Sequence, residues 1–282
     1  MKMANERIGF MQGRLSPLSN GNIQAFPWDH WQEEFALAST LGIGLMEWTL
    51  DQDRLYENPL ITVSGQKRIG DLCKCFGIAI PSLTGDCFMQ APFWKSSGTE
   101  REALQNDFTV IVEACGAVGI ALIVMPLVDN GCLENKKQED ILVKYLHSQE
   151  DFIASKGVKV IFESDFGPER LAGFIARFNP KSFGINYDIG NSAALRFLPT
   201  KEFSAYGERI LNVHIKDRPF GGTTVPLGEG DADFETVFSL LADITYRGNY
   251  ILQTARATNN NHAQMLSRYS AMSKAWIESY GA

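Results

Sequence analysis

The amino-acid sequence predicts an α/β fold, a closed (β/α)8 barrel. Short apolar runs alternate with helix-like stretches along the whole chain. At five of these boundaries a glycine joins the helix to the strand, where a left-handed residue can end the helix and turn the chain. The length of 282 residues is close to the about 250 residues that form such a barrel in one domain.

Eight apolar runs are the expected strands, because near-continuous apolar strands separated by helices are typical of a parallel sheet covered by helices. In chain order they are Arg7 to Met11, Ile43 to Met46, Ile78 to Ile80, Ile120 to Met125, Val158 to Phe162, Phe183 to Tyr187, Ile210 to Ile215 and Tyr250 to Leu252. The five joining glycines are Gly42, Gly77, Gly119, Gly157 and Gly248.

The stretches between these runs have the composition of helices, among them Asp29 to Leu41, Thr99 to Val118, Lys137 to Lys156, Asp233 to Tyr246 and His262 to Tyr280. Thr99 and Glu102 have the spacing of a capping box. The crossover from Ser192 to Arg209 carries the weakest helical signal. A doubly wound sheet is disfavoured, because neither a GxGxxG turn nor a GxxxxGK[ST] loop follows any of the strands.

Composition excludes several classes of partner. The formal net charge of −7 disfavours a basic surface for nucleic acid or anionic lipid. The longest apolar run, Ile120 to Val128, is too short to cross a membrane. Met1 to Arg7 lacks the apolar segment of a secretory signal, so we expect a cytoplasmic protein with a small-molecule partner. Five cysteines without a CxxC pair argue against a disulfide framework and a structural zinc site.

Polar residues close several of the apolar runs, at the barrel end where such folds carry their chemistry. These residues are Glu47, Glu163, Asp188 and Gln253, and His214 lies near the end of the seventh run, one residue before Ile215. A single strand-end carboxylate is more often a helix cap or an ion-pair partner. Several that converge at a partly buried rim repel one another, and a divalent cation compensates for that repulsion. The alternative is a network of ion pairs without metal.

Four of these residues lie on successive strands and form the expected metal site: Glu163, Asp188, His214 and Gln253. Their oxygen and nitrogen donors, without sulfur, suit Mn²⁺, Mg²⁺ or Co²⁺, with Zn²⁺ as the alternative.

Four segments in this order resemble a known family. They are Phe162-Glu163-Ser164-Asp165, Tyr187-Asp188-Ile189-Gly190-Asn191, Val213-His214-Ile215-Lys216-Asp217 and Pro226-Leu227-Gly228-Glu229-Gly230 followed by Asp233-Phe234. The chain resembles the xylose isomerase-like sugar-phosphate isomerase/epimerase superfamily, and most of all its L-ribulose-5-phosphate 3-epimerase (hexulose-6-phosphate isomerase-like) branch. The resemblance implies one TIM-barrel domain over residues 1–282, assembled as a homodimer or homotetramer.

The resemblance also implies the activity, a metal-dependent isomerisation or epimerisation of a ketose sugar or sugar phosphate through an enediolate. By resemblance Glu163, Asp188 and His214 take the first three metal positions. The fourth position, a glutamate in the family, is Gln253 here. In such epimerases the two glutamates act on opposite faces of the substrate, which makes Glu163 and Gln253 the candidate catalytic residues.

An amide cannot accept a proton as a carboxylate does, so Gln253 leaves alternatives open. One is a one-base isomerisation or a dehydratase or lyase reaction on the same scaffold. Another is a replacement base such as Asp86 or Glu47. The third is a sugar-binding protein without catalytic activity.

Further residues are candidates for contact with a sugar substrate: Glu47, Asn191, Lys216, Arg218 and Glu229. Lys216 and Arg218 precede Gly221 to Thr224, in the region after the seventh strand where barrels often bind phosphate. The alternative is a flexible loop with solvated charges.

Phe88, Phe93 and Trp94 lie in the long segment from Asp86 to Gly98. They form either an apolar lid over the site or a layer packed against helices. Arg14 and Arg256 are weaker candidates for substrate contacts, and His30, His147 and His262 are not expected to bind metal.

Overall fold

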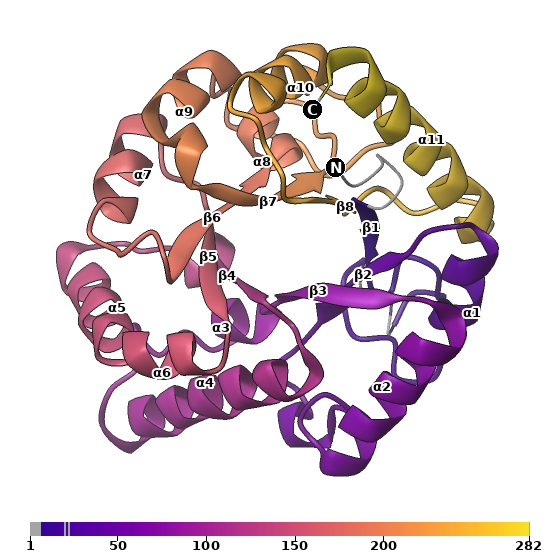
Figure 1. Cartoon of the computed structure of the whole chain (residues 1–282). Helices are drawn as coiled ribbons and strands as arrows, with labels where there is room; N and C mark the ends of the chain where they lie inside the picture. The colour runs from indigo at the N-terminus through magenta and orange to yellow at the C-terminus, as the bar shows by residue number, and fades with distance from the viewer. Residues whose placement is uncertain (1–6, 20, 22, 282) are drawn as a thin grey trace.

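The computed structural model describes residues 7–19, 21 and 23–281. Its eight parallel strands close into a barrel in chain order, which confirms the predicted (β/α)8 TIM-barrel fold (Figure 1). The barrel closes by pairing of β1 with β8. The strands are β1 (Ile8–Met11), β2 (Leu45–Thr49), β3 (Ala79–Thr84), β4 (Leu122–Leu127), β5 (Lys159–Ser164), β6 (Phe183–Asp188), β7 (Ile210–Ile215) and β8 (Asn249–Leu252).

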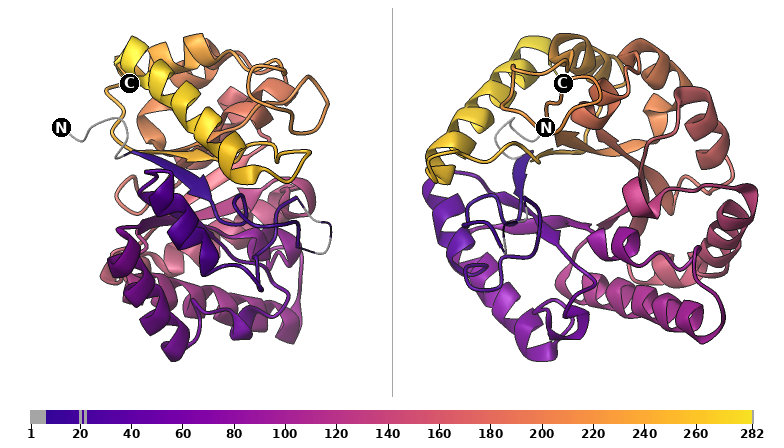
Figure 2. Two further views of the ribbon diagram at one scale, coloured as in Figure 1. Left: turned by 90° about the vertical axis from the view of Figure 1, so that its right-hand side faces the viewer. Right: turned by 180° about the vertical axis from the view of Figure 1, so that it is seen from behind.

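Helices surround the barrel as an outer ring, which Figures 1 and 2 show along and across its axis. They cover the outer faces of the strands, so the strands are almost wholly buried. The helices are α1 (Glu33–Thr40), α2 (Val63–Phe76), α3 (Asp86–Gln90), α4 (Gly98–Val118), α5 (Lys136–Ser148), α6 (Glu150–Ser155), α7 (Pro168–Ile175), α8 (Ile189–Ala194), α9 (Pro199–Tyr206), α10 (Phe234–Asp243) and α11 (His262–Tyr280), with short 3-10 turns at Leu55–Glu57, Asp129–Gly131 and Gly207–Arg209.

The glycine joints have two different physical causes. Gly42, Gly77, Gly119 and Gly157 have φ values of 69°, 68°, 83° and 70°, the left-handed conformation predicted for them. Gly248 is different, because its φ is not in the left-handed range. A Cβ there would lie 2.3 Å from the backbone oxygen of Leu211, so close packing requires this glycine.

Three expected helix features differ in the structure. The capping box of Thr99 and Glu102 is wrong: α4 begins at Gly98, so Thr99 lies inside the first turn, and the N-cap residue Ser97 makes no side-chain capping bond. The expected helix from Lys137 to Lys156 is two helices, α5 and α6. The weakly predicted crossover from Ser192 to Arg209 contains the end of α8 and all of α9.

Phe88, Phe93 and Trp94 belong to the core. Their exposed fractions are 4%, 1% and 1%. Phe93 packs edge-on against Tyr145 of α5, and Phe88 contacts Phe108 of α4. Packing against helices is therefore the correct alternative, and the lid is not formed by these rings.

Within the described part of the chain, no helix combines the length and the apolar character needed to cross a bilayer. The expected lack of a secretory signal concerns residues 1–7, of which residues 1–6 lie outside the described residues.

Candidate metal centre and active site

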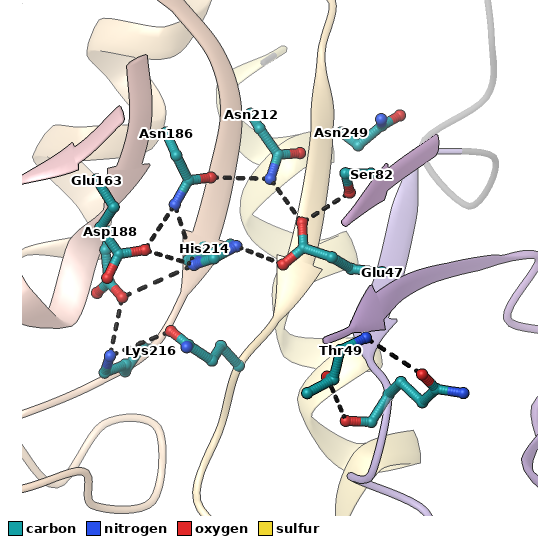
Figure 3. A network of polar contacts seen from close by, with 12 residues as sticks. Glu47, Thr49, Ser82, Glu163, Asn186, Asp188, Asn212, His214, Lys216 and Asn249 are labelled. Carbon is teal, nitrogen blue, oxygen red and sulfur yellow. Dashed lines mark hydrogen bonds and ion pairs between the residues drawn. The ribbon is translucent and has the colours of Figure 1, made fainter. Parts of the chain in front are cut away.

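Three of the four predicted metal ligands converge at the carboxyl ends of β5, β6 and β7. One ligand atom each from Glu163, Asp188 and His214 lie within 4.8 Å of one another. Figure 3 shows these side chains pointing toward one another. They are nearly shielded from solvent, with exposed fractions of 6%, 5% and 0%. Neighbouring parallel strands bring their ends to one rim, and this arrangement places the three donors together.

The backbone after β6 fixes Asp188. Its Oδ1 accepts a hydrogen bond of 2.8 Å from the backbone N–H of Asn191 and caps α8. Oδ2 remains for other partners and lies 3.9 Å from His214 Nδ1. Gly190 leaves space for Lys216, the residue after β7, because a Cβ there would lie 2.7 Å from Lys216 Cγ.

Glu47 orients the histidine from the other side of the barrel. Its Oε1 lies 2.7 Å from His214 Nε2, and its Oε2 accepts a 2.7 Å hydrogen bond from the hydroxyl of Ser82. Nδ1 of His214 then faces Glu163 Oε2 at 3.1 Å. A carboxylate that holds the far nitrogen of a metal-binding histidine is a common supporting arrangement. Glu47 is 0% exposed, so it lies behind His214 and does not line the cavity where a substrate contact was expected.

Two asparagines join the carboxylates into one network, and the sequence analysis missed both. Asn186 Nδ2 donates to Glu163 Oε2 at 2.9 Å and lies 3.0 Å from His214 Nδ1. Asn212 Nδ2 lies 2.8 Å from Asn186 Oδ1 and 3.1 Å from Glu47 Oε2. Each asparagine precedes a strand-end ligand by two residues, and this spacing points both side chains into the barrel. That spacing was the signal available in the sequence.

Opposite charges keep the buried carboxylates ionised. Burial alone would lower the pKa of His214, but the carboxylates of Glu47 and Glu163 raise it to about 10. Burial would likewise raise the pKa of both glutamates, yet contact with His214 lowers each below its usual value. Lys216 adds a further lowering of the pKa of Glu163. The site therefore presents Glu163 as a carboxylate, the form that binds metal and accepts protons.

Lys216, which the sequence predicted as a substrate contact, lies between two of the predicted metal ligands. Its Nζ donates to Asp188 Oδ2 at 2.9 Å and to Gln253 Oε1 at 3.1 Å. The side chain is buried, with 9% exposed. Gln253 thus reaches the rim directly after β8, and its carbonyl oxygen faces the ammonium group. A carbonyl oxygen has two lone pairs, so Gln253 can accept this bond and still offer one to a cation.

A cavity of about 440 Å³ opens above this network. Glu163, Lys216 and Gln253 line it, together with Asn191 and Arg218. Asn191 Nδ2 donates to Glu163 Oε1 at 2.8 Å, and Arg218 Nη1 donates to Asn191 Oδ1 at 2.7 Å. Four residues predicted to contact substrate or metal, Asn191, Lys216, Arg218 and Gln253, therefore line the same cavity as Glu163.

The remaining candidates lie elsewhere. Glu229 is exposed in the loop before α10 and does not line this cavity. Arg14 Nε and Arg256 Nη1 donate to the backbone oxygens of Thr254 and Ser16, so they hold loops together. His30, His147 and His262 do not line this cavity either.

Comparison with known proteins identifies the family. The family model described as xylose isomerase-like TIM barrel matches residues 35–274. The chain belongs to this family.

Relatives and solved structures agree with that membership. The chain is 24% identical over 270 residues to the L-ribulose-5-phosphate 3-epimerase UlaE of Salmonella paratyphi C, covering 89% of this chain and 91% of the relative. The IolI protein with a bound zinc atom superposes with a TM-score of 0.76 at 17% identity, covering 97% and 99% of the two chains. A xylose isomerase-like TIM-barrel protein of Mycobacterium smegmatis in complex with magnesium gives 0.72 at 14% identity over 100% of both chains. These two structures support the fold, and the relatives named as L-ribulose-5-phosphate 3-epimerases support an isomerase-like enzyme.

Proposed function

We propose that this protein is a divalent-metal-dependent isomerase or epimerase of a ketose sugar or sugar phosphate. The observation that carries the proposal is the convergence of Glu163, Asp188 and His214 beside a cavity large enough for a sugar. Proton transfer next to a carbonyl requires an ionised base and a way to stabilise the enediolate, and this site has donors for both. The named activity of the UlaE relative supports the same substrate class.

The residues fit a divalent cation. Two carboxylates and an imidazole nitrogen form a donor set without sulfur, which suits Mn²⁺, Mg²⁺ or Co²⁺, and Zn²⁺ as the alternative. Glu47 leaves His214 Nδ1 facing the carboxylates, the side from which a cation would be bound. Gln253 would offer its amide oxygen as the fourth ligand. When bound, the cation would favour negative charge on the carbonyl and hydroxyl oxygens of the sugar.

The protein's own groups then have separate tasks. Glu163 removes the proton from the carbon next to the carbonyl, since its carboxylate lines the cavity. Asn191 holds that carboxylate in place through its 2.8 Å hydrogen bond. Lys216 neutralises part of the charge of Asp188 and keeps the amide of Gln253 turned toward it.

Gln253 is the observation that favours a second candidate, a dehydratase or lyase. Such a reaction needs one base at carbon and a proton for the departing hydroxyl, so a second base on the opposite face is not required. Formation of a product lighter by one water would favour this alternative over epimerisation.

The test uses the purified protein after dialysis against chelator and reloading with Mn²⁺. We expect the reloaded protein to retain metal and to incorporate solvent deuterium into L-ribulose 5-phosphate in heavy water, at C3 for an epimerase or at C1 for an isomerase. L-ribulose without phosphate is the parallel substrate. Full metal content without deuterium incorporation into either sugar would contradict an isomerase or epimerase and leave the sugar-binding alternative.

Arg218 is the best placed cation for an anionic end of the substrate. Its guanidinium lines the cavity and is held by Asn191 Oδ1 and the backbone oxygen of Gly222. Arg218→Met should raise KM for L-ribulose 5-phosphate about 10-fold or more, because a charge-assisted contact to phosphate contributes about 1.5–3 kcal/mol. KM for L-ribulose should change little.

Arg196→Met is the matched control, because Arg196 stacks on Phe220 outside this cavity. Equal changes of KM for the phosphorylated and unphosphorylated sugar in Arg218→Met would contradict a phosphate contact.

A further inference from the structure

Because residue 253 is a glutamine, the strand-8 position carries no carboxyl group. A chain of hydrogen bonds connects the Gln253 side chain to the carboxyl group of another residue. Gln253 Nε2 donates to Gln24 Oε1 at 2.9 Å. Gln24 Nε2 donates in turn to Asp86 Oδ2 at 2.7 Å. An amide exchanges no proton with a substrate near neutral pH, whereas a carboxyl group does. Asp86 is therefore the end of this chain that can take part in proton transfer.

Asp86 is built into the wall of the cavity. It is the first residue of α3, directly after β3, and is 4% exposed. A Cβ on the preceding Gly85 would lie 2.8 Å from the backbone oxygen of Val124, so only glycine lets the chain turn this closely. Asp86 lines the same cavity as Glu163. Among the residues that the structure describes, none donates a hydrogen bond to Asp86 Oδ1, which leaves this oxygen available to a ligand.

We propose that Asp86 is the second acid/base residue of the epimerisation, and this assignment rests on the proposed function. Glu163 takes the proton as the C–H bond breaks, and the electron pair forms the carbon–carbon double bond of the enediolate. The pair then returns to carbon and takes the carboxyl proton of Asp86 on the other face, and the carbonyl forms again. Glu163 ends protonated and Asp86 ionised, and exchange with water resets both.

The electrostatic surroundings of Asp86 suit this task. Burial raises its pKa to about 7; the charges of Asp51 and Glu163 add to the rise, while the hydrogen bond from Gln24 and the charge of Arg14 oppose it. Asp86 therefore carries a proton for much of the time near neutral pH. Two carboxyl groups whose surroundings separate their pKa values are the usual basis for a division into acid and base.

This assignment also explains an amide at position 253. Gln253 offers a donor to Gln24 Oε1, so Gln24 turns its own NH₂ group toward Asp86. Arg14 Nη2 also donates to Gln24 Oε1, at 3.4 Å, whereas a carboxylate at 253 would place a second acceptor against this oxygen and weaken the hold on the amide. Gln253 is thus a positioning residue for Asp86.

The test compares epimer formation with deuterium incorporation, using Mn²⁺-loaded protein and L-ribulose 5-phosphate in heavy water. In Asp86→Asn, formation of the 3-epimer should fall about 10²-fold or more, the usual contribution of a general acid or base. Incorporation of deuterium at C3 of the unepimerised sugar should continue within a few-fold, because Glu163 still exchanges its proton. A loss of protein structure would remove both, so the split between them is the diagnostic result.

The pH profile gives a second, independent measurement. The pair must hold one proton in either direction of reaction, so kcat/KM of the wild type should fall as pH rises above about 7, where Asp86 loses its proton. Asp51→Asn removes a negative charge near Asp86. Asp51 accepts hydrogen bonds from Phe26 and Gln90 and does not line the cavity. In Asp51→Asn the decrease of kcat/KM at high pH should begin at a lower pH than in the wild type. The turnover at pH values below this decrease should be unchanged.

Folding is checked by thermal unfolding at about pH 8. The pKa of Asp86 is raised from 3.8 to about 7 in the folded protein. Protonation of Asp86 therefore stabilises the fold fully below pH 3.8, and this stabilisation is lost as the pH rises through about 7. Asparagine does not ionise, so Asp86→Asn should unfold at the wild-type temperature or above.

The outcomes separate the two proposals. Deuterium incorporation by the wild type with normal epimerisation in Asp86→Asn, or an unshifted decrease of kcat/KM in Asp51→Asn, overturns the role of Asp86 alone. No deuterium incorporation by the wild type overturns the proposed function, and the role of Asp86 with it.

Discussion

Glu163→Gln is expected to abolish deuterium incorporation from solvent, with a loss of about 10²- to 10⁴-fold, the range for removal of a positioned base. The carboxylate lines the cavity, and His214, Asn186 and Asn191 hold it in place. Glutamine keeps the size of the side chain but cannot accept the proton. The measurement is the initial rate of deuterium incorporation at C3 of L-ribulose 5-phosphate.

The matched control for this variant is Glu202→Gln, which makes the same change at another buried glutamate. Glu202 is 2% exposed and bonds the hydroxyls of Tyr187, Ser192 and Tyr206 outside the cavity. It should retain deuterium incorporation within a few-fold. Wild-type rates in Glu163→Gln, or equal losses in both variants, would contradict Glu163 as the base.

His214→Ala is expected to remove the metal and to destabilise the metal-free protein. The imidazole, which is 0% exposed, lies between Glu47 and Glu163. Without it two buried carboxylates lose their partner, and breaking a buried ion pair costs about 3–5 kcal/mol. Metal content after dialysis and the free energy of unfolding in denaturant measure the two effects.

Glu47→Gln tests the role of Glu47 in orienting His214, separately from the role of His214 as a metal ligand. The glutamine can still accept a hydrogen bond from His214 Nε2 through its oxygen, but it lacks the charge. Metal affinity should fall about 10- to 100-fold, the usual effect of changing a residue that supports a ligand. Stoichiometric metal in His214→Ala, or a larger loss of metal in Glu47→Gln, would contradict the assignment of His214 as a ligand.

The sequence by itself determined the barrel and the rim on which the polar residues gather. Apolar runs, glycine joints and helical stretches alternate in a strict order, and parallel strands in that order bring their carboxyl ends to one side. Glu163 and Asp188 follow from this rule because each closes an apolar run, and His214 lies one residue before the end of the seventh run. The strand-8 position of Gln253 follows in the same way.

Only the tertiary structure decided the partners of these residues. Closure of the barrel brings Glu47 to His214 across 167 residues of sequence, and it connects Gln253 through Gln24 to Asp86. The inward direction of Lys216 depends on the path of the chain after β7 and on the space left by Gly190. Strand periodicity specifies which face a residue occupies, whereas contacts between side chains from distant strands depend on register, closure and packing, which no local pattern encodes.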